Sequence, residues 1–182
     1  MADRPLTGIL LVGGASSRFG SPKALARIGG ETFAERGWRV LEQACGEVIA
    51  VGKTADALQL PFPVLDDGAA ARAPVFGVVA GLRAASTGVC VVLPVDCIAI
   101  TSEVLRRLGE ATAVPRSGPL PGAYATSMLP LLEARIARGE LSLRGVNPAV
   151  LHVDEALLAD VDTRADLDLA ALDHGRPTRR EP

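Results

Sequence analysis

Short runs of apolar residues alternate along this chain with longer stretches in which apolar positions recur at helical spacing. Residues 89–93 form the clearest run, because four of the five are valine or leucine. Continuous apolar runs of this kind are typical of parallel strands that are buried on both faces. We therefore predict a single α/β domain with a mostly parallel sheet and helices on both of its faces, a three-layer architecture. The expected strands are 8–12, 48–51, 63–65, 89–93, 111–114, 122–126 and 151–153.

Helices are predicted where apolar residues return every three or four positions. The first follows Thr32, and its inward stripe includes Phe33 and Leu41. Thr101 or Ser102 suits the N-cap of another. Residues 160–163 are expected to be extended and to lead into the last helix. The expected helices are 33–44, 77–85, 102–108, 128–138 and a final one that ends at residue 172. We expect residues 1–172 to form the domain and residues 173–182 to form a disordered tail.

The composition fits one compact domain. The chain has 182 residues, of which 48% are apolar and 22% are charged, as is typical of globular proteins. A net charge of −2 gives no broad positive field, so we expect no binding to nucleic acid or to a membrane surface. The three cysteines lack a metal-binding spacing, and we expect them to be reduced. No signal-like N-terminus or membrane-length apolar run occurs, so we expect a cytoplasmic protein.

A turn of small residues follows the first expected strand. Residues 10–23 read Leu-Leu-Val-Gly-Gly-Ala-Ser-Ser-Arg-Phe-Gly-Ser-Pro-Lys. Glycine and serine allow backbone N–H groups to approach an anion closely, and Arg18 and Lys23 add positive charge at fixed offsets. The spacing excludes both the P-loop and the dinucleotide-binding fingerprint. The segment therefore predicts a polyphosphate site of another kind.

Asp96 is the candidate metal ligand. It follows the buried strand 89–93 closely, and Pro94 ends the strand pairing. Ligands of open α/β sheets gather outside the carboxyl ends of the strands, so Asp96 and the turn after Val12 should face one crevice. Mg²⁺ prefers oxygen ligands and commonly takes only one or two protein carboxylates. The alternative is that Asp96 merely organises the turn before the helix at Thr101.

The pattern Gly-Gly-x-Ser-x-Arg-x-Gly-x-x-Lys at residues 13–23 resembles the signature of nucleotidyltransferases, and most closely that of the molybdenum cofactor guanylyltransferases. Residues 94–97 resemble their Pro-Cys-Asp-x-Pro element without its last proline, and residues 73–77 resemble their Gly-Pro-Leu-Ala-Gly stretch. This resemblance implies a Rossmann-like fold of the nucleotide-diphospho-sugar transferase type. It implies catalytic roles for Arg18, Lys23 and Asp96, with Asp96 on the metal. The nucleotide contacts that it implies are Leu11, Val12, Gly13, Gly14, Lys23, Asp67 and Asp96.

Asp67 has an alternative role as a turn residue before Gly68, and Arg18 could instead form a salt bridge with Asp66 or Asp67. Weaker resemblances follow later in the chain. Residues 121–124 correspond to a family loop that faces the second substrate, and residues 141–144 resemble its Ser-Leu-Arg segment. The sequence Asp-Val-Asp-Thr at 160–163 resembles Asn-x-Asn-Thr, but an ionised aspartate only accepts hydrogen bonds. The possible acceptor contacts are Tyr124, Arg144, Asp160 and Asp162, of which the first two are expected to be core or rim residues before substrate contacts.

The resemblance implies a Mg²⁺-dependent enzyme that transfers GMP from GTP to molybdopterin and releases pyrophosphate. A molybdoenzyme or an insertion chaperone could then receive the product. Two alternatives stay open. The first is a cytidylyltransferase acting on molybdopterin or another small phosphorylated metabolite, since such enzymes often carry pairs like Pro22-Lys23 and Asp162-Thr163 but typically begin with Ala-Ala-Gly. The second is a catalytically inactive nucleotide-binding module.

Overall fold

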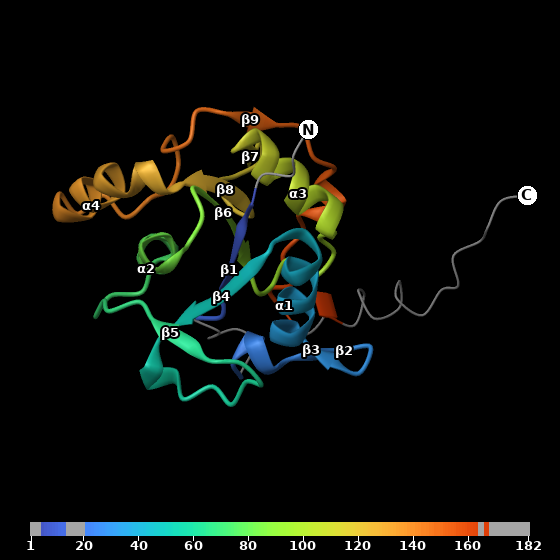
Figure 1. Ribbon diagram of the computed structural model, residues 1–182. Coiled ribbons are helices and arrows are strands. Elements are labelled where there is room, and N and C mark those ends of the chain that lie inside the picture. Colours follow the sequence, from blue (N-terminus) through green and yellow to red (C-terminus); the bar gives the residue numbers. More distant parts are fainter. Residues whose placement is uncertain (1–4, 14–20, 164–165, 168–182) are drawn as a thin grey trace, which may run out of the picture.

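A five-stranded sheet forms the centre of the molecule (Figure 1). The computed structural model describes residues 5–13, 21–163 and 166–167. The strand order is β5-β4-β1-β6-β8, in which the first four strands are parallel and β8 runs antiparallel to β6. The predicted mostly parallel sheet is therefore confirmed. The strands are β1 (Thr7–Leu11), β4 (Glu47–Gly52), β5 (Val64–Asp66), β6 (Val89–Pro94) and β8 (Gly122–Ala125).

Helices cover both faces of this sheet (Figure 1). On one face lie α1 (Phe33–Ala44) and α3 (Ser102–Ala111), and on the other lie α2 (Pro74–Ala84) and α4 (Leu129–Ala137). Successive side chains of β1 alternate between two apolar cores, because side chains of a strand point to opposite faces. Leu10 packs in the core beneath α1 and α3, whereas Ile9 and Leu11 pack in the core beneath α2 and α4.

Among the residues that the structure describes, two small sheets lie outside the central one. The hairpin of β2 (Arg27–Ile28) and β3 (Glu31–Thr32) was not predicted, and its turn consists of Gly29 and Gly30, both with positive φ. The second sheet pairs β7 (Val114–Pro115) with β9 (Val150–Leu151). The prediction of a strand over 111–114 was wrong in its start, because α3 continues through Ala111. Thr112 then ends the helix in a left-handed conformation with φ of 47°.

Local sequence signals explain where the helices begin. Thr32 caps α1 in a capping box: its hydroxyl accepts a hydrogen bond from the Glu35 N–H at 3.1 Å, and the Glu35 carboxylate accepts one from the Thr32 N–H at 2.7 Å. Helix α2 begins at Pro74 rather than at the expected residue 77, since proline suits a first helical turn. Gly77 instead allows α2 to approach the sheet, because a Cβ there would lie 2.7 Å from Leu11 Cδ2.

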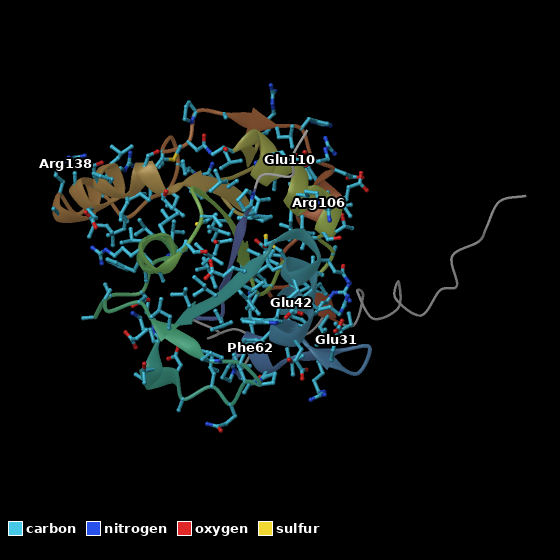
Figure 2. All side chains as sticks on the ribbon, viewed as in Figure 1. Glu31, Glu42, Phe62, Arg106, Glu110 and Arg138 are labelled. Atoms are coloured by element: carbon cyan, nitrogen blue, oxygen red, sulfur yellow. The ribbon has the colours of Figure 1, made fainter. Side chains whose placement is uncertain are left out.

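The segment after β4 folds back over α1. Phe62 stacks on Trp38 of α1 with ring centroids 4.1 Å apart, and Figure 2 shows Phe62 close to that helix. In the described ranges, short 3-10 helices complete the connections: η1 (Lys23–Leu25), η2 (Thr54–Asp56), η3 (Thr126–Met128) and η4 (Glu155–Leu157).

Residues 160–163 form no strand. Asp166 and Leu167 are helical, and the rest of the helix expected up to residue 172 lies outside the described residues, as does the tail 173–182. Within the described part of the chain, no helix has the length and apolar character needed to cross a membrane.

Candidate active site

A cavity of about 330 Å³ lies where the central parallel strands end. This is the edge at which open α/β sheets bind their ligands. The turn after β1, the residues after β4, β5 and β6, and the start of α2 form its walls. The lining residues are Leu11, Val12, Gly13, Lys23, Val51, Gly52, Lys53, Asp67, Arg72, Ala73, Pro74, Gly77, Pro94, Val95, Asp96 and Leu120.

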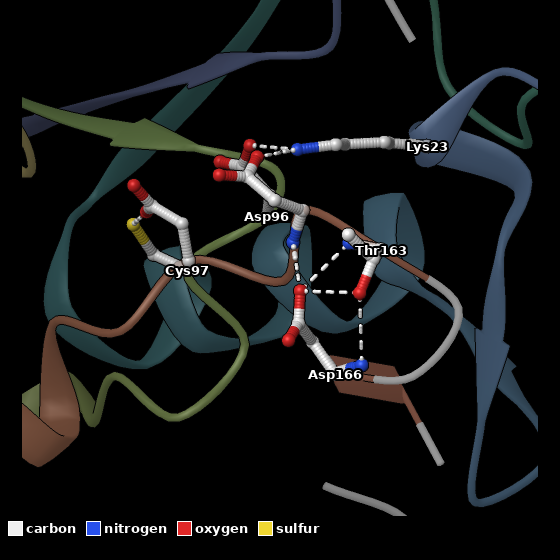
Figure 3. Close-up of polar contacts among 7 residues, drawn as sticks. Lys23, Asp96, Cys97, Thr163 and Asp166 are labelled. Atoms are coloured by element: carbon white, nitrogen blue, oxygen red, sulfur yellow. Dashed lines mark hydrogen bonds and ion pairs between the residues drawn. The ribbon is translucent and has the colours of Figure 1, made fainter. Parts of the chain in front are cut away.

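Lys23 and Asp96 meet at one end of this cavity. Lys23 lies at the start of η1, directly after Pro22, and Asp96 lies in the turn after β6. The Lys23 Nζ atom is 2.8 Å from Asp96 Oδ2 (Figure 3). The side chains are 15% and 23% exposed, so both are largely shielded from water but open to the cavity. The structure thus brings together the loop lysine and the strand-end carboxylate that the sequence suggested would face one crevice.

A third charged group joins this pair. Asp162 Oδ1 lies 2.6 Å from Lys23 Nζ, although the two residues are 139 positions apart in the chain. Burial acts to lower the pKa of Lys23, but its hydrogen bonds to Asp162 and Asp96 outweigh that effect and raise the pKa above its ordinary value. Lys23 is therefore a protonated ammonium group at neutral pH, held by two carboxylates.

Hydrogen bonds hold the segment 160–163 beside Asp96 and Cys97, and Figure 3 shows those of Cys97, Thr163 and Asp166. The Val161 N–H donates to the Asp96 carbonyl at 3.1 Å, and the Cys97 thiol donates to Asp160 Oδ1 at 2.9 Å. Asp166 then accepts hydrogen bonds from the N–H of Thr163 at 2.7 Å and from its hydroxyl at 2.8 Å. The spacing Thr-x-x-Asp is a capping signal, and sequence reasoning could have used it to place this turn.

The group of Asp96, Cys97 and Asp160 offers ligand atoms that lie within 4.8 Å of one another. Burial raises the pKa of the Cys97 thiol far above its usual range, so it remains protonated and offers no thiolate. Burial also raises the pKa of Asp160, which lies near the negative charges of Asp96 and Asp162. The donors that remain are carboxylate oxygens, and this donor set fits Mg²⁺ rather than a thiolate-binding metal.

The other end of the cavity contains a second ion pair. Lys53 Nζ lies 2.7 Å from Asp67 Oδ1 and donates a further hydrogen bond to the Ala69 carbonyl at 2.5 Å. Asp67 Oδ1 also accepts from the Ala69 N–H at 2.9 Å. The side chains of Lys53 and Asp67 are 11% and 9% exposed. Asp67 therefore organises a turn and also lines the cavity, and its contact with a nucleotide stays a prediction.

Lys53 is not among the catalytic or nucleotide-binding residues that the resemblance implies, although the stretch around residues 52 and 53 was considered for contacts that determine base specificity. Its signal in the sequence is its position directly after a strand, the same signal that pointed to Asp96. Arg72 also lines the cavity and was not expected there; its guanidinium forms an ion pair with Asp56.

Tyr124 and Arg144 do not line the cavity. Tyr124 has the core position that the sequence favoured for it, and the contact of Arg144 with an acceptor stays a prediction. Tyr124 is 0% exposed, and its hydroxyl donates to the Pro119 carbonyl at 2.7 Å. It is a core residue that anchors the loop before β8, in which Leu120 forms part of the cavity wall. Arg144 is exposed and is not among the lining residues. Asp160 and Asp162 do not line the cavity either, but they lie beside its Lys23 end, where Asp162 contacts Lys23 and Asp160 is close to Asp96. Their contacts with an acceptor stay predictions.

Of the nucleotide contacts implied by the resemblance, Leu11, Val12, Gly13, Lys23, Asp67 and Asp96 all line the cavity. Gly14 and Arg18 lie outside the described residues. The cysteines do not form disulfides: Cys45, Cys90 and Cys97 are free, and burial raises the pKa of Cys45 and Cys90 to about 12.

The fold has three layers, and its cavity lies at the strand ends, where a loop lysine contacts a carboxylate that follows β6. This is the architecture of a nucleotidyltransferase. Residues 8–153 match the family model described as MobA-like NTP transferase domain. The chain therefore belongs to the MobA-like NTP transferase domain family.

Individual relatives agree with this family. A protein of Rhodopirellula baltica named "Probable molybdenum cofactor guanylyltransferase" is 32% identical, over 91% of this chain and 92% of its own length. A protein of the same name from Pelotomaculum thermopropionicum is 29% identical, over 94% of this chain and 88% of its own length. Among solved structures, molybdopterin-guanine dinucleotide biosynthesis protein A from Archaeoglobus fulgidus superimposes with a TM-score of 0.77 at 24% identity, covering 92% of this chain and 98% of that one. At this identity, the structural match shows the fold.

Proposed function

We propose that this protein is a Mg²⁺-dependent guanylyltransferase that transfers GMP from GTP to molybdopterin and releases pyrophosphate. The observation that carries the proposal is the contact between Lys23 and Asp96 at one end of the cavity where the parallel strands end. The names of the relatives favour a molybdopterin acceptor and a guanine nucleotide. We further propose that the reaction takes place in the cytoplasm, where free cysteines stay reduced, and that a molybdoenzyme or insertion chaperone receives the product.

The reaction needs little proton transfer. A phosphate oxygen of the acceptor forms a bond to the α-phosphorus of GTP, and the bond from that phosphorus to the bridging oxygen of the β-phosphate breaks. The bonding electrons leave with pyrophosphate. An attacking phosphate monoester is already largely ionised near neutral pH, so no general base is required. The site must instead align the two substrates and neutralise the negative charge of the phosphates.

Lys23 and Asp96 divide this electrostatic work. The ammonium of Lys23 would contact the phosphates, and we propose the same role for Arg18. Asp96 would hold Mg²⁺, with Asp160 and Asp162 as neighbouring carboxylates. When bound, the ion would supply positive charge to the phosphate oxygens. The carboxylate donor set and the exposure of Asp96 to the cavity support this assignment.

The pair of Lys53 and Asp67 supports a guanine base at the opposite end. No described residue donates a hydrogen bond to Asp67 Oδ2, which leaves this oxygen as a free acceptor in a nearly buried carboxylate. Guanine presents two adjacent donors, N1–H and the 2-amino group, to such an oxygen, and its O6 can accept from the Lys53 ammonium. Cytosine presents only its 4-amino group as a donor. The chemistry of this pair therefore favours GTP over CTP.

The proposal is tested by measuring pyrophosphate release with molybdopterin and each of the four nucleoside triphosphates. We expect turnover with GTP and Mg²⁺. A preference for CTP would show a cytidylyltransferase, and nucleotide binding without product would show a binding module.

Asp96→Asn separates catalysis from folding in the same assay. We expect it to reduce turnover to background while its thermal unfolding stays that of the wild type. Asp154→Asn is the matched control, because Asp154 is an exposed N-cap of η4 and asparagine caps equally well. Near-normal turnover by Asp96→Asn would refute the assignment of the metal ligand.

A further inference from the structure

Lys23 cannot contact a phosphate freely while two carboxylates hold its ammonium group. We propose that Asp162 restrains Lys23 until a divalent cation binds the neighbouring carboxylates, so that this lysine couples metal binding to nucleotide binding. This inference rests on the proposed function and adds a role for Asp162 within it. Asp162 is a positioning residue here, since it acts through Lys23.

The geometry of the ion pairs carries the inference. The Lys23 ammonium lies 2.6 Å from Asp162 and 2.8 Å from Asp96, and its side chain is only 15% exposed. The Asp162 side chain is 60% exposed, and an ion pair at such an exposed position contributes little free energy. The attraction to Lys23 alone would therefore not hold Asp162 in place. Its placement is instead determined by the backbone on either side. Val161 is bonded to the Asp96 carbonyl, and Thr163 is bonded to Asp166.

The charge balance of the site explains why a metal would be required. Among the described residues at this end of the cavity, the three carboxylates of Asp96, Asp160 and Asp162 face the one ammonium of Lys23, so these four groups together carry a net negative charge. A nucleoside triphosphate without metal would be repelled by the carboxylates, and Lys23 would have to leave Asp162 to meet it. A divalent cation on the carboxylates reverses the balance and weakens their hold on Lys23. Because linkage is reciprocal, the nucleotide would strengthen metal binding by the same factor.

Calorimetric titration of GTP into the full-length protein, with EDTA and with saturating Mg²⁺, measures this coupling. For the wild type we expect Mg²⁺ to strengthen GTP binding strongly. In Asp162→Asn, GTP binding without metal should become about tenfold tighter, because one negative charge near the bound phosphates is removed. The increase in GTP affinity that Mg²⁺ causes should shrink by about the same factor. Two variants should bind GTP as the wild type does. Asp162→Glu keeps the charge, and Asp154→Asn removes a charge at the N-cap of η4, outside the segment 160–163.

The alternatives give different results. If GTP binding without metal is the same in Asp162→Asn and the wild type, the inference is overturned. If Asp162→Asn instead weakens GTP binding only when Mg²⁺ is present, Asp162 is a metal ligand and the restraint on Lys23 is rejected. A failure of the wild type to bind either GTP or CTP, with or without Mg²⁺, would overturn the proposed function itself and is thereby distinguished from a failure of the coupling.

Discussion

Replacement of Lys23 by glutamine should change catalysis and metal binding in opposite directions. The substitution removes the positive charge between Asp96 and Asp162 but leaves a side chain of similar length with amide donors. The transition state would lose a cation that neutralises the phosphates. The two carboxylates would lose a competitor for Mg²⁺. A residue whose only role is to hold the fold together would not separate these two effects.

The expected size follows from the distances and the exposure. Two unit charges about 4 Å apart interact by about 4 kcal/mol at the effective dielectric constant near a protein surface, and by about 1 kcal/mol in bulk water. With a side chain that is 15% exposed, Lys23 is closer to the first limit. We therefore expect kcat/KM to fall by about 100- to 1,000-fold, comparable to the loss of one oxyanion-hole donor. The affinity for Mg²⁺ alone should rise by about 100-fold, which corresponds to about 2.7 kcal/mol between these two limits.

Steady-state pyrophosphate release gives kcat/KM, and calorimetric titration with Mg²⁺ in the absence of nucleotide gives the metal affinity. Arg107→Gln is the matched control, because it removes a positive charge from an exposed position on α3. The reasoning would be refuted by a Lys23→Gln protein that loses metal affinity together with activity, or by one that keeps its activity.

Three further predictions concern the base, a helix cap and the response to acid. Asp67→Asn should lower kcat/KM for GTP by about 10- to 100-fold, since a hydrogen bond to a charged group contributes about 1.5–3 kcal/mol. It should improve the relative use of xanthosine triphosphate, whose 2-oxo group can accept from the new amide, and an unchanged ratio in competition assays would exclude contact with the base. Thr32→Ala should lower the free energy of unfolding by about 0.5–2 kcal/mol in urea titrations, whereas Thr32→Ser should retain most of the stability of the wild type. Equal stability of the two variants would contradict the role of Thr32 as a cap. Hydrogen bonds from Thr54 and Gly68 lower the pKa of Asp66 to about 2. The stability that Asp66 contributes is therefore complete above its unfolded pKa near 4 and is lost as the pH falls towards 2, so wild type should lose more stability than Asp66→Asn over this range in urea titrations.

The parallel part of the fold could be predicted because both faces of β1, β4 and β6 are covered. A strand in that position needs apolar side chains at nearly every residue, and the sequence carries that pattern directly. The direction of β8 could not be predicted, since a strand buried on both faces has the same pattern in either direction. The hairpin of β2 and β3 has only two residues in each strand, too few for a detectable period.

The site residues also differ in whether the neighbouring sequence identifies them or only the folded structure does. Asp96 could be identified because it lies two residues after a buried strand, and the end of a strand determines where its next residues lie. Asp67 was identified through the resemblance to the guanylyltransferases. The contact between Lys23 and Asp162 depends instead on how the chain folds between two residues 139 positions apart, and neither residue carries a local sign of its partner. The position of Tyr124 was ambiguous for a related reason: alternation within a strand gives its face, but not whether a hydroxyl reaches a ligand or a backbone carbonyl.

The reversed direction of β8 has a consequence for how this cavity can change. A parallel strand contributes its exit turn to the ligand-binding edge, whereas β8 contributes the loop through which the chain enters it, and Leu120 lies in that loop. The wall at Leu120 therefore belongs to a different connection from the short turn that carries Asp96, and α3 lies between the two in the chain. Insertions or replacements in residues 116–121 could remodel the shape offered to a second substrate while the turn after β6 stays intact. The wall of the cavity at Leu120 can therefore change in sequence and shape without changing the position of Asp96 on the other side.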